Sequence, residues 1–269
     1  MGNAAGVIDR HSSESAAALE RAILQAIADV RASPQLSLTR LQGRLPHFDG
    51  MNFIDPVTKV PVVTKEGPAP VHEMVAILTS AVASSTPFCL EPQKCLSLAA
   101  EDHAVDVGAT SMVQHCGSDG SAPADRMSRY GSWSVCCGEC IWYGSLEGAE
   151  ATPAAERIVD ALLVDDGVPD RGHRKCLLDA RMLFAGVGVA SHPIFGFCVV
   201  IDLAGGVIEG LPAAAAAAEP EAAADVAAAM QNQTAIEKHQ RLVERVATGP
   251  PLPSQETIDR LRGSANTHW

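Results

Sequence analysis

The sequence contains no long hydrophobic run. Nowhere do about eighteen apolar residues follow one another without a charge, as a membrane-spanning helix requires. The alanine-rich stretch near the C-terminus comes nearest, but Glu219, Pro220, Glu221 and Asp225 interrupt it. The first thirty residues lack the basic and apolar segments of a secretory signal peptide. We therefore expect a soluble, cytoplasmic protein that is not exported through a signal peptide.

Basic residues are scarce relative to acidic ones. Twenty Lys and Arg residues stand against 32 Asp and Glu residues, which gives a formal net charge of −12. Such a charge repels phosphate backbones and anionic lipid surfaces at long range, so nucleic acid is not an expected partner. With 269 residues, 47% of them apolar, the chain can build one large core plus an appendage.

Two common hydrolase signatures are also missing. The sequence has neither the H-E-x-x-H motif of zinc proteases nor the G-x-S-x-G turn of serine hydrolases. Ser118 and Ser121 lie close to His115, so a Ser-His-Glu triad is formally available. Serines in a glycine-rich loop more often make turn hydrogen bonds, and no confident catalytic residue emerges.

The cysteines do not form a recognisable zinc-finger pattern. In a chain without an export signal we expect thiols, although an even number could pair in an oxidising compartment. Cys137 and Cys140 form one C-x-x-C, which lacks the second pair of a zinc knuckle and is interpreted as small buried thiols. Cys116, beside His115, is a candidate extra ligand. The eight cysteines are Cys89, Cys95, Cys116, Cys136, Cys137, Cys140, Cys176 and Cys198.

Four polar residues stand among glycines and apolar runs in the middle of the chain. They are His115 in MVQHCGSDGS, Glu139 in CCGECIWYG, Asp165 in VDALLVDDGV and His173 in PDRGHRKCLL. Two imidazoles and two carboxylates are the groups from which a divalent-metal site or an acid/base pocket is built.

These motifs resemble the CAP superfamily, the SCP-like domains of cysteine-rich secretory, antigen 5 and pathogenesis-related proteins. The branch of bacteria and single-celled eukaryotes is the most similar. The resemblance covers roughly residues 15–210. It implies an α+β fold, an α-β-α sandwich with a small antiparallel sheet. It runs from LSLAAEDHAVDVG through HCGSDGS, PADRMSRYG, CGEC and LLVDDGVPDRGHRKCLLD to FAGVGVASHPIFGFCVVIDLAGG.

The resemblance also implies a cavity that holds two histidines and two acids. His115 and His173 would be the histidines and possible zinc ligands, and Glu139 and Asp165 would be the acids. Asp165 stands where the family usually has glutamate, and Cys140 replaces the asparagine of the family's GEN motif. A carboxylate that accepts the second ring proton of a metal-bound histidine would fix its tautomer.

Hydrophobic periodicity predicts the main secondary structure elements. Helices are expected over 15–32, over 71–82 and after Pro92, where His103 is interpreted as a hydrogen-bonded core residue. A fourth helix should begin at Thr152 and Pro153 and carry Asp165 on its buried stripe. The glycine- and proline-rich stretch 43–70 is expected to lack regular structure. Two β-prone runs near 183–190 and 195–204 should pair antiparallel.

The two ends of the chain suggest attachments. Residues 1–14 form an N-terminal segment in which Gly2 could be myristoylated or could stay unmodified. One acyl chain would give only weak membrane contact. Residues 211–269 are rich in alanine and proline and predict a helical arm. Its apolar face needs a partner, either its own domain or another protein.

Three functions are consistent with these patterns. The first is a non-enzymatic cytoplasmic binding protein whose arm, residues 212–269, docks to a protein partner or a large assembly such as the cytoskeleton. The second is a zinc-dependent hydrolase or protease with His115 and His173 as ligands and Glu139 as general base. The third, lipid or sterol binding, rests on the family resemblance alone.

Overall fold

The computed structural model describes residue 8 and residues 13–56, 59–84, 90–146 and 148–209. Gly2, Cys89 and the C-terminal arm lie outside these described residues. Within them the chain is a mixture of helices and sheet, so the predicted α+β class is confirmed. None of the described helices has the length and apolar character needed to cross a membrane.

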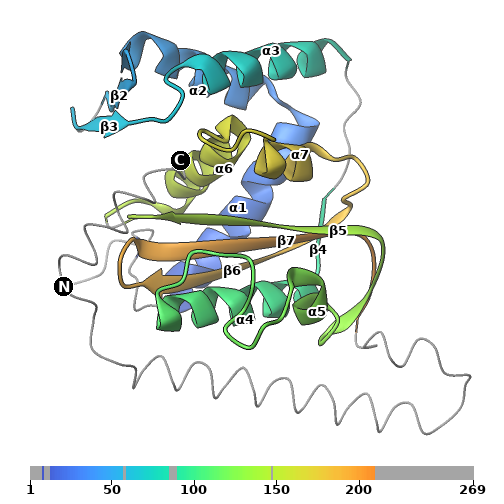
Figure 1. The fold of residues 1–269 in the computed structure, drawn as a ribbon. Coiled ribbons are helices and arrows are strands. Elements are labelled where there is room, and N and C mark those ends of the chain that lie inside the picture. The colour runs from blue at the N-terminus through green and yellow to red at the C-terminus, as the bar shows by residue number, and fades with distance from the viewer. Residues whose placement is uncertain (1–7, 9–12, 57–58, 85–89, 147, 210–269) are drawn as a thin grey trace, which may run out of the picture.

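A four-stranded sheet forms the centre of the fold (Figure 1). Its strand order is β4-β6-β7-β5, and β5 therefore lies at one edge. β6 and β7 pair antiparallel as predicted, and β7 also pairs antiparallel with β5, whereas the short β4 runs parallel to β6. The strands are β4 (Glu91–Pro92), β5 (Gly131–Gly144), β6 (Phe184–His192) and β7 (Gly196–Glu209).

Helices cover both faces of this sheet (Figure 1). α4 (Lys94–Thr110) and α5 (Pro123–Met127) lie on one face. α1 (Ser13–Ala32), α6 (Ala151–Val164) and α7 (Gly172–Leu178) lie on the other, where the largest group of buried apolar side chains gathers. α2 (Gln35–Arg44) and α3 (Ala69–Ser84) form a further layer beyond α6.

Two glycines of β6 let α4 approach the sheet closely. A Cβ atom on Gly186 would collide with the backbone of Leu96 and Ser97, and one on Gly188 with the backbone of Ala100 and Glu101. Only glycine leaves this space. The close packing fixes the position of α4 and of the loop that follows it.

The expectation that residues 43–70 lack regular structure is wrong. A short 3-10 helix, η1 (Leu45–His47), leads into a three-stranded antiparallel sheet of β1 (Phe48–Asp49), β2 (Asn52–Ile54) and β3 (Pro61–Val63). Dense glycine and proline mark turns, but strands of two or three residues fit between those turns. Pro61 lies in an edge strand, where a missing N–H costs no ladder hydrogen bond.

Candidate functional site

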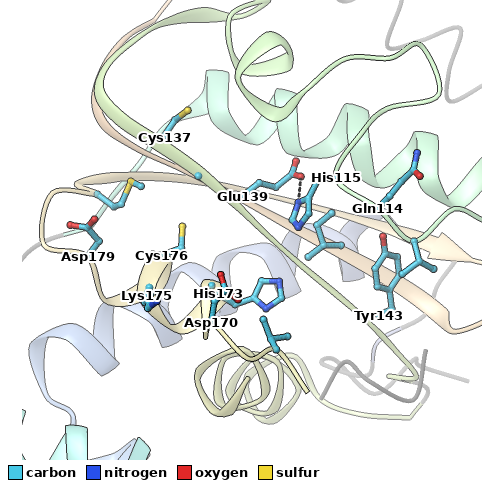
Figure 2. Close-up of a pocket in the computed structure, with 16 residues that line it drawn as sticks. Gln114, His115, Cys137, Glu139, Tyr143, Asp170, His173, Lys175, Cys176 and Asp179 are labelled. Atoms are coloured by element: carbon cyan, nitrogen blue, oxygen red, sulfur yellow. Dashed lines mark hydrogen bonds and ion pairs between the residues drawn. The ribbon is translucent and has the colours of Figure 1, made fainter. Parts of the chain in front are cut away.

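A cavity of about 600 Å³ opens beside the edge strand β5. Three segments that are distant in sequence line it: the loop after α4 with His115, the middle of β5 with Glu139, and α7 with His173. Figure 2 shows these side chains converging on the same space. Its volume lies within the usual range for small-molecule sites.

The first pair in the cavity joins His115 to Glu139. Nδ1 of His115 lies 2.7 Å from Oε1 of Glu139, and the guanidinium of Arg126 donates to Oε2 at 2.5 Å. Glu139 and Arg126 are both buried, whereas the side chain of His115 is half exposed. Glu139 is therefore a buried carboxylate held between an imidazole at the cavity and a cation behind it.

The surroundings of Glu139 keep it ionised. Burial alone would raise its pKa, but the hydrogen bond with His115 and the charges of His103 and Arg126 outweigh that effect, and the pKa lies below its usual value. His103 is fully buried on α4, with Nε2 2.9 Å from the carbonyl oxygen of Gln114 and 3.9 Å from Glu139. It is thus a hydrogen-bonded core residue, as predicted, and a neighbour of the site.

The second pair joins His173 to Asp165. Nδ1 of His173 lies 2.7 Å from Oδ1 of Asp165, and Oδ2 accepts the backbone N–H groups of His173 and Arg174 at 3.0 and 3.2 Å. Asp165 was expected on the buried stripe of a helix, but α6 ends at Val164 and Asp165 follows it in the left-handed conformation, with φ of 59°. This turn aims the carboxylate at the start of α7.

The next residue, Asp166, is also buried, and its two oxygens accept the backbone N–H groups of Lys65 and Glu66 at 2.7 and 2.9 Å. It therefore holds the turn after α6 against the loop before α3. The two neighbouring acids fix two different segments, and only Asp165 contacts a cavity residue.

The two histidine rings lie next to one another, with 6.4 Å between their centroids (Figure 2). Because Nδ1 of each ring is engaged by a carboxylate, Nε2 is the ring nitrogen that would coordinate a metal ion. This carboxylate–histidine arrangement is the one that orients metal-binding imidazoles, so the residues fit a two-histidine metal site. Across the described ranges, no cluster of three or more His, Cys, Asp or Glu side chains is placed to hold a metal ion.

The serines near His115 serve the loop. The hydroxyl and backbone N–H of Ser118 both donate to the carboxylate of Asp106, at 2.5 and 2.6 Å, and the carbonyl oxygen of Ser121 accepts from Arg126. The bonds of Ser118 agree with the interpretation as turn hydrogen bonds, whereas the buried hydroxyl of Ser121 has no hydrogen-bond partner within the described residues.

Arg126 is the main residue that the sequence did not reveal. Asp125 and Arg126 are adjacent and opposite in charge, which by itself favours a local ion pair or a helix start. Asp125 accepts the backbone N–H of Ala122 at the start of α5, but Arg126 pairs with Glu139 and not with its neighbour. The sequence carries no sign that Arg126 turns into the core.

A second buried acid, Asp202, lies behind Glu139. The two residues are directly opposite in the pairing of β5 with β7. Neither carboxyl oxygen of Asp202 forms a well-shaped hydrogen bond within the described residues. Burial and the charge of Glu139 raise the pKa of Asp202 well above its usual range, which favours the neutral form of this side chain. A single acid in the apolar run VVIDLA is the sequence signal that could have identified it.

The two cysteines of the C-x-x-C motif point to opposite faces of the sheet. Cys137 packs with the apolar cluster beneath α4 and α5, whereas Cys140 packs on the opposite face with the cluster of α1, α6 and α7, because strand residues alternate in direction. All seven described cysteines are free thiols. Cys116 is exposed, with its sulfur 3.6 Å from the carbonyl oxygen of Gly117.

Cys140 instead faces α7, where its sulfur donates to the carbonyl oxygen of His173 at 3.8 Å. Interaction with Cys176 of α7, together with burial, raises the pKa of Cys140 well above its usual value. The same interaction lowers the pKa of Cys176 against the effect of burial, and the charge of Arg31 lowers it further.

Comparisons with known proteins do not identify a family for this chain. No protein-family model matches the chain, and no curated protein matches it either. Among solved structures, an outer surface protein from Borrelia burgdorferi aligns with 50% of this chain and 93% of its own, at 20% identity and a TM-score of 0.36.

Proposed function

We propose that this chain is a CAP-type domain that works as a non-enzymatic binding and interaction protein in the cytoplasm. Two features support the proposal. The four residues expected from the motifs, His115, Glu139, Asp165 and His173, form two pairs whose histidines share one cavity. Helices flank both faces of a small sheet.

The observation that carries the non-enzymatic assignment is the state of Glu139. Both of its carboxylate oxygens are engaged, one by His115 and one by Arg126, and its pKa is lowered. A general base needs an oxygen free to take a proton and a pKa near the working pH. Glu139 is better suited to orient His115 for binding than to move protons.

Attachment to a partner is assigned to residues 212–269. We expect the full chain to sediment with detergent-insoluble cell structures, and a chain ending at residue 211 to be released. A peptide of residues 212–269, added in excess to the full chain, should release it as well. His115→Ala is the matched control, because it alters the cavity and leaves the arm intact. Sedimentation that survives both truncation and the competing peptide would refute this assignment.

A second candidate function, a zinc-dependent hydrolase, is favoured by the two histidine rings in one cavity. His115 and His173 would hold the ion through Nε2, with Glu139 and Asp165 fixing the ring orientations. Bound zinc would supply Lewis acidity.

Equilibrium dialysis against zinc tests this second function. Binding should be lost in both His115→Ala and His173→Ala and kept in His192→Ala, which changes a buried histidine that packs behind Tyr143 and is not itself a lining residue. Hydrolysis of a peptide or ester substrate that requires both cavity histidines would then favour the enzyme. Zinc binding that is equal in all variants would remove this candidate.

A further inference from the structure

Two thiols from different elements meet at the wall of the cavity. Cys140 is completely buried on β5, and Cys176 of α7 is partly exposed and lines the cavity. The sulfur of Cys140 lies 3.8 Å from the carbonyl oxygen of His173 on α7, and the sulfur of Cys176 lies against Gly138 of β5, so each thiol faces the element that carries the other. The pair therefore has one sulfur that solvent can reach and a second, buried sulfur on the strand against which α7 packs.

The neighbouring backbone is shaped around Cys176. A Cβ atom on Gly138 would lie 2.6 Å from the sulfur of Cys176, which is too close for any side chain. Gly138 lies two residues before Cys140, so both face the same side of the sheet. Glycine at this position leaves the space that the Cys176 sulfur occupies beside β5.

A buried cation lies below the pair. The guanidinium of Arg31 donates to the carbonyl oxygens of Leu177 and Met182, at 2.8 and 2.5 Å, and its charge acts on both thiols. Cations next to a partly exposed cysteine are characteristic of sites that react with disulfides. Cys137 also lines the cavity but lies on the opposite face of β5, so it is not part of this arrangement.

We propose that Cys140 and Cys176 form a thiol–disulfide exchange site, with Cys176 as the attacking sulfur, Cys140 as the resolving sulfur and a small disulfide as the co-reactant. This chemistry requires neither a metal nor a ligand in the cavity, so it is independent of the proposed function.

The exchange proceeds in two balanced steps. The Cys176 thiolate attacks a small disulfide RSSR, which forms a Cys176–SR bond, breaks the S–S bond and releases RS⁻. The Cys140 sulfur then attacks the Cys176 sulfur. This second step forms the Cys140–Cys176 bond and expels a second RS⁻, and the thiol protons of the two cysteines pass to the leaving thiolates. The protein loses two electrons and RSSR is reduced to two RSH.

Oxidation would tie β5 covalently to α7. These two elements carry Glu139 and His173, one from each imidazole–carboxylate pair. The bond would therefore link the two sides of the cavity.

The test exposes the full 269-residue chain to glutathione disulfide, followed by alkylation of free thiols and mass mapping of a non-reducing digest. The expected product is one cross-linked peptide pair containing Cys140 and Cys176. In Cys140→Ser the resolving sulfur is absent, so a glutathione adduct should accumulate on Cys176. In Cys176→Ser, Cys140 should remain a free thiol.

Cys95→Ser is the matched control, because Cys95 is another buried cysteine but lies in the cluster beneath α4. It should form the Cys140–Cys176 cross-link as the unchanged protein does. If Cys140→Ser does not fold, the order of alkylation in the unchanged protein gives a second measurement. Cys176 should then react before Cys137, which also lines the cavity.

Three results would overturn the proposal. One is that Cys140 and Cys176 both stay free while the exposed Cys116 becomes glutathionylated. Another is a cross-link between Cys176 and a cysteine other than Cys140. The third is that the cross-link forms only in denaturant.

Discussion

The two imidazole–carboxylate pairs of the cavity have the same contact length, 2.7 Å, but are built differently. Glu139 is held by a buried cation, Arg126, which comes from another element. Asp165 is held by the backbone N–H groups at the start of α7, next to the histidine it serves. The same imidazole–carboxylate contact thus depends on a buried charge in the His115–Glu139 pair and on backbone hydrogen bonds in the His173–Asp165 pair. Substitutions should therefore affect the two pairs differently.

Removing the cation should have the largest effect. Arg126→Met leaves Glu139 as a buried anion without its main partner, and we expect a loss of about 3–5 kcal/mol in the free energy of unfolding, measured by denaturant titration. Arg181→Met is the control, because the Arg181 side chain is 69% exposed and solvent screens its pair with Asp179, so its loss should be far smaller. Equal losses in the two variants would mean that Arg126 is not the support of the first pair.

The second pair should be more tolerant. Asp165→Ala removes the acceptor for two backbone N–H groups and for the ring of His173, and places alanine in the left-handed conformation. We expect a loss of about 2 kcal/mol. Asp166→Ala removes two comparable backbone contacts without touching His173. NMR spectra of the histidine rings should change at His173 only in the Asp165 variant; the same change in both would contradict this division.

The free energy of unfolding, measured over a series of pH values, should show that the Glu139 pair depends on charge. The pKa of Glu139 lies below 4.5, so its contribution to stability is present above pH 4.5 and is lost as the pH falls through the folded-state pKa. Glu139→Gln should cost on the order of 1–2 kcal/mol at pH 7. This gap from the unchanged protein should shrink on acidification. A gap that stays constant down to pH 3 would show that the charge on Glu139 contributes nothing.

The smallest effect is expected at the exposed end of the first pair. The His115 side chain is half exposed, so His115→Ala should lower the free energy of unfolding by less than about 1 kcal/mol. Denaturant titration of His115→Ala and Asp165→Ala under the same conditions compares the two losses in the free energy of unfolding directly. A loss as large as that of Arg126→Met would mean that His115 supports the fold and is not mainly a ligand-facing group.

The sequence predicted parts of the molecule that depend on local patterns. Helices α1, α3, α4 and α6 and the β6–β7 hairpin follow from spacing, whereas α2, α7 and the strand β5 were not predicted. The motifs around His115, Glu139, Asp165 and His173 named the residues that line or support the cavity. The partners of these residues depend on distant packing, which local patterns do not encode. Arg126 is 13 residues from Glu139 along the chain and directly follows the acid Asp125, with which its charge would more simply pair. Cys140 and Cys176 likewise come from two different elements.

The conformation of Asp165 shows a second limit of periodicity. Spacings of three, four and seven residues extend the buried stripe of α6 to this position, but the helix ends one residue earlier. The stripe predicted burial correctly, since Asp165 is 2% exposed. It could not show that the backbone turns there, because a left-handed aspartate is compatible with the same apolar spacing.

The turn at Asp165 also bears on how the chain folds. Asp165 and His173 are eight residues apart, whereas His115 and Glu139 are 24 apart, and Glu139 also depends on the pairing of β5 with β7. Closing a short loop costs less chain entropy than closing a long one. The α6–α7 segment can therefore take up its native shape as a local unit, while the opposite wall must wait until strands from distant parts of the chain have aligned.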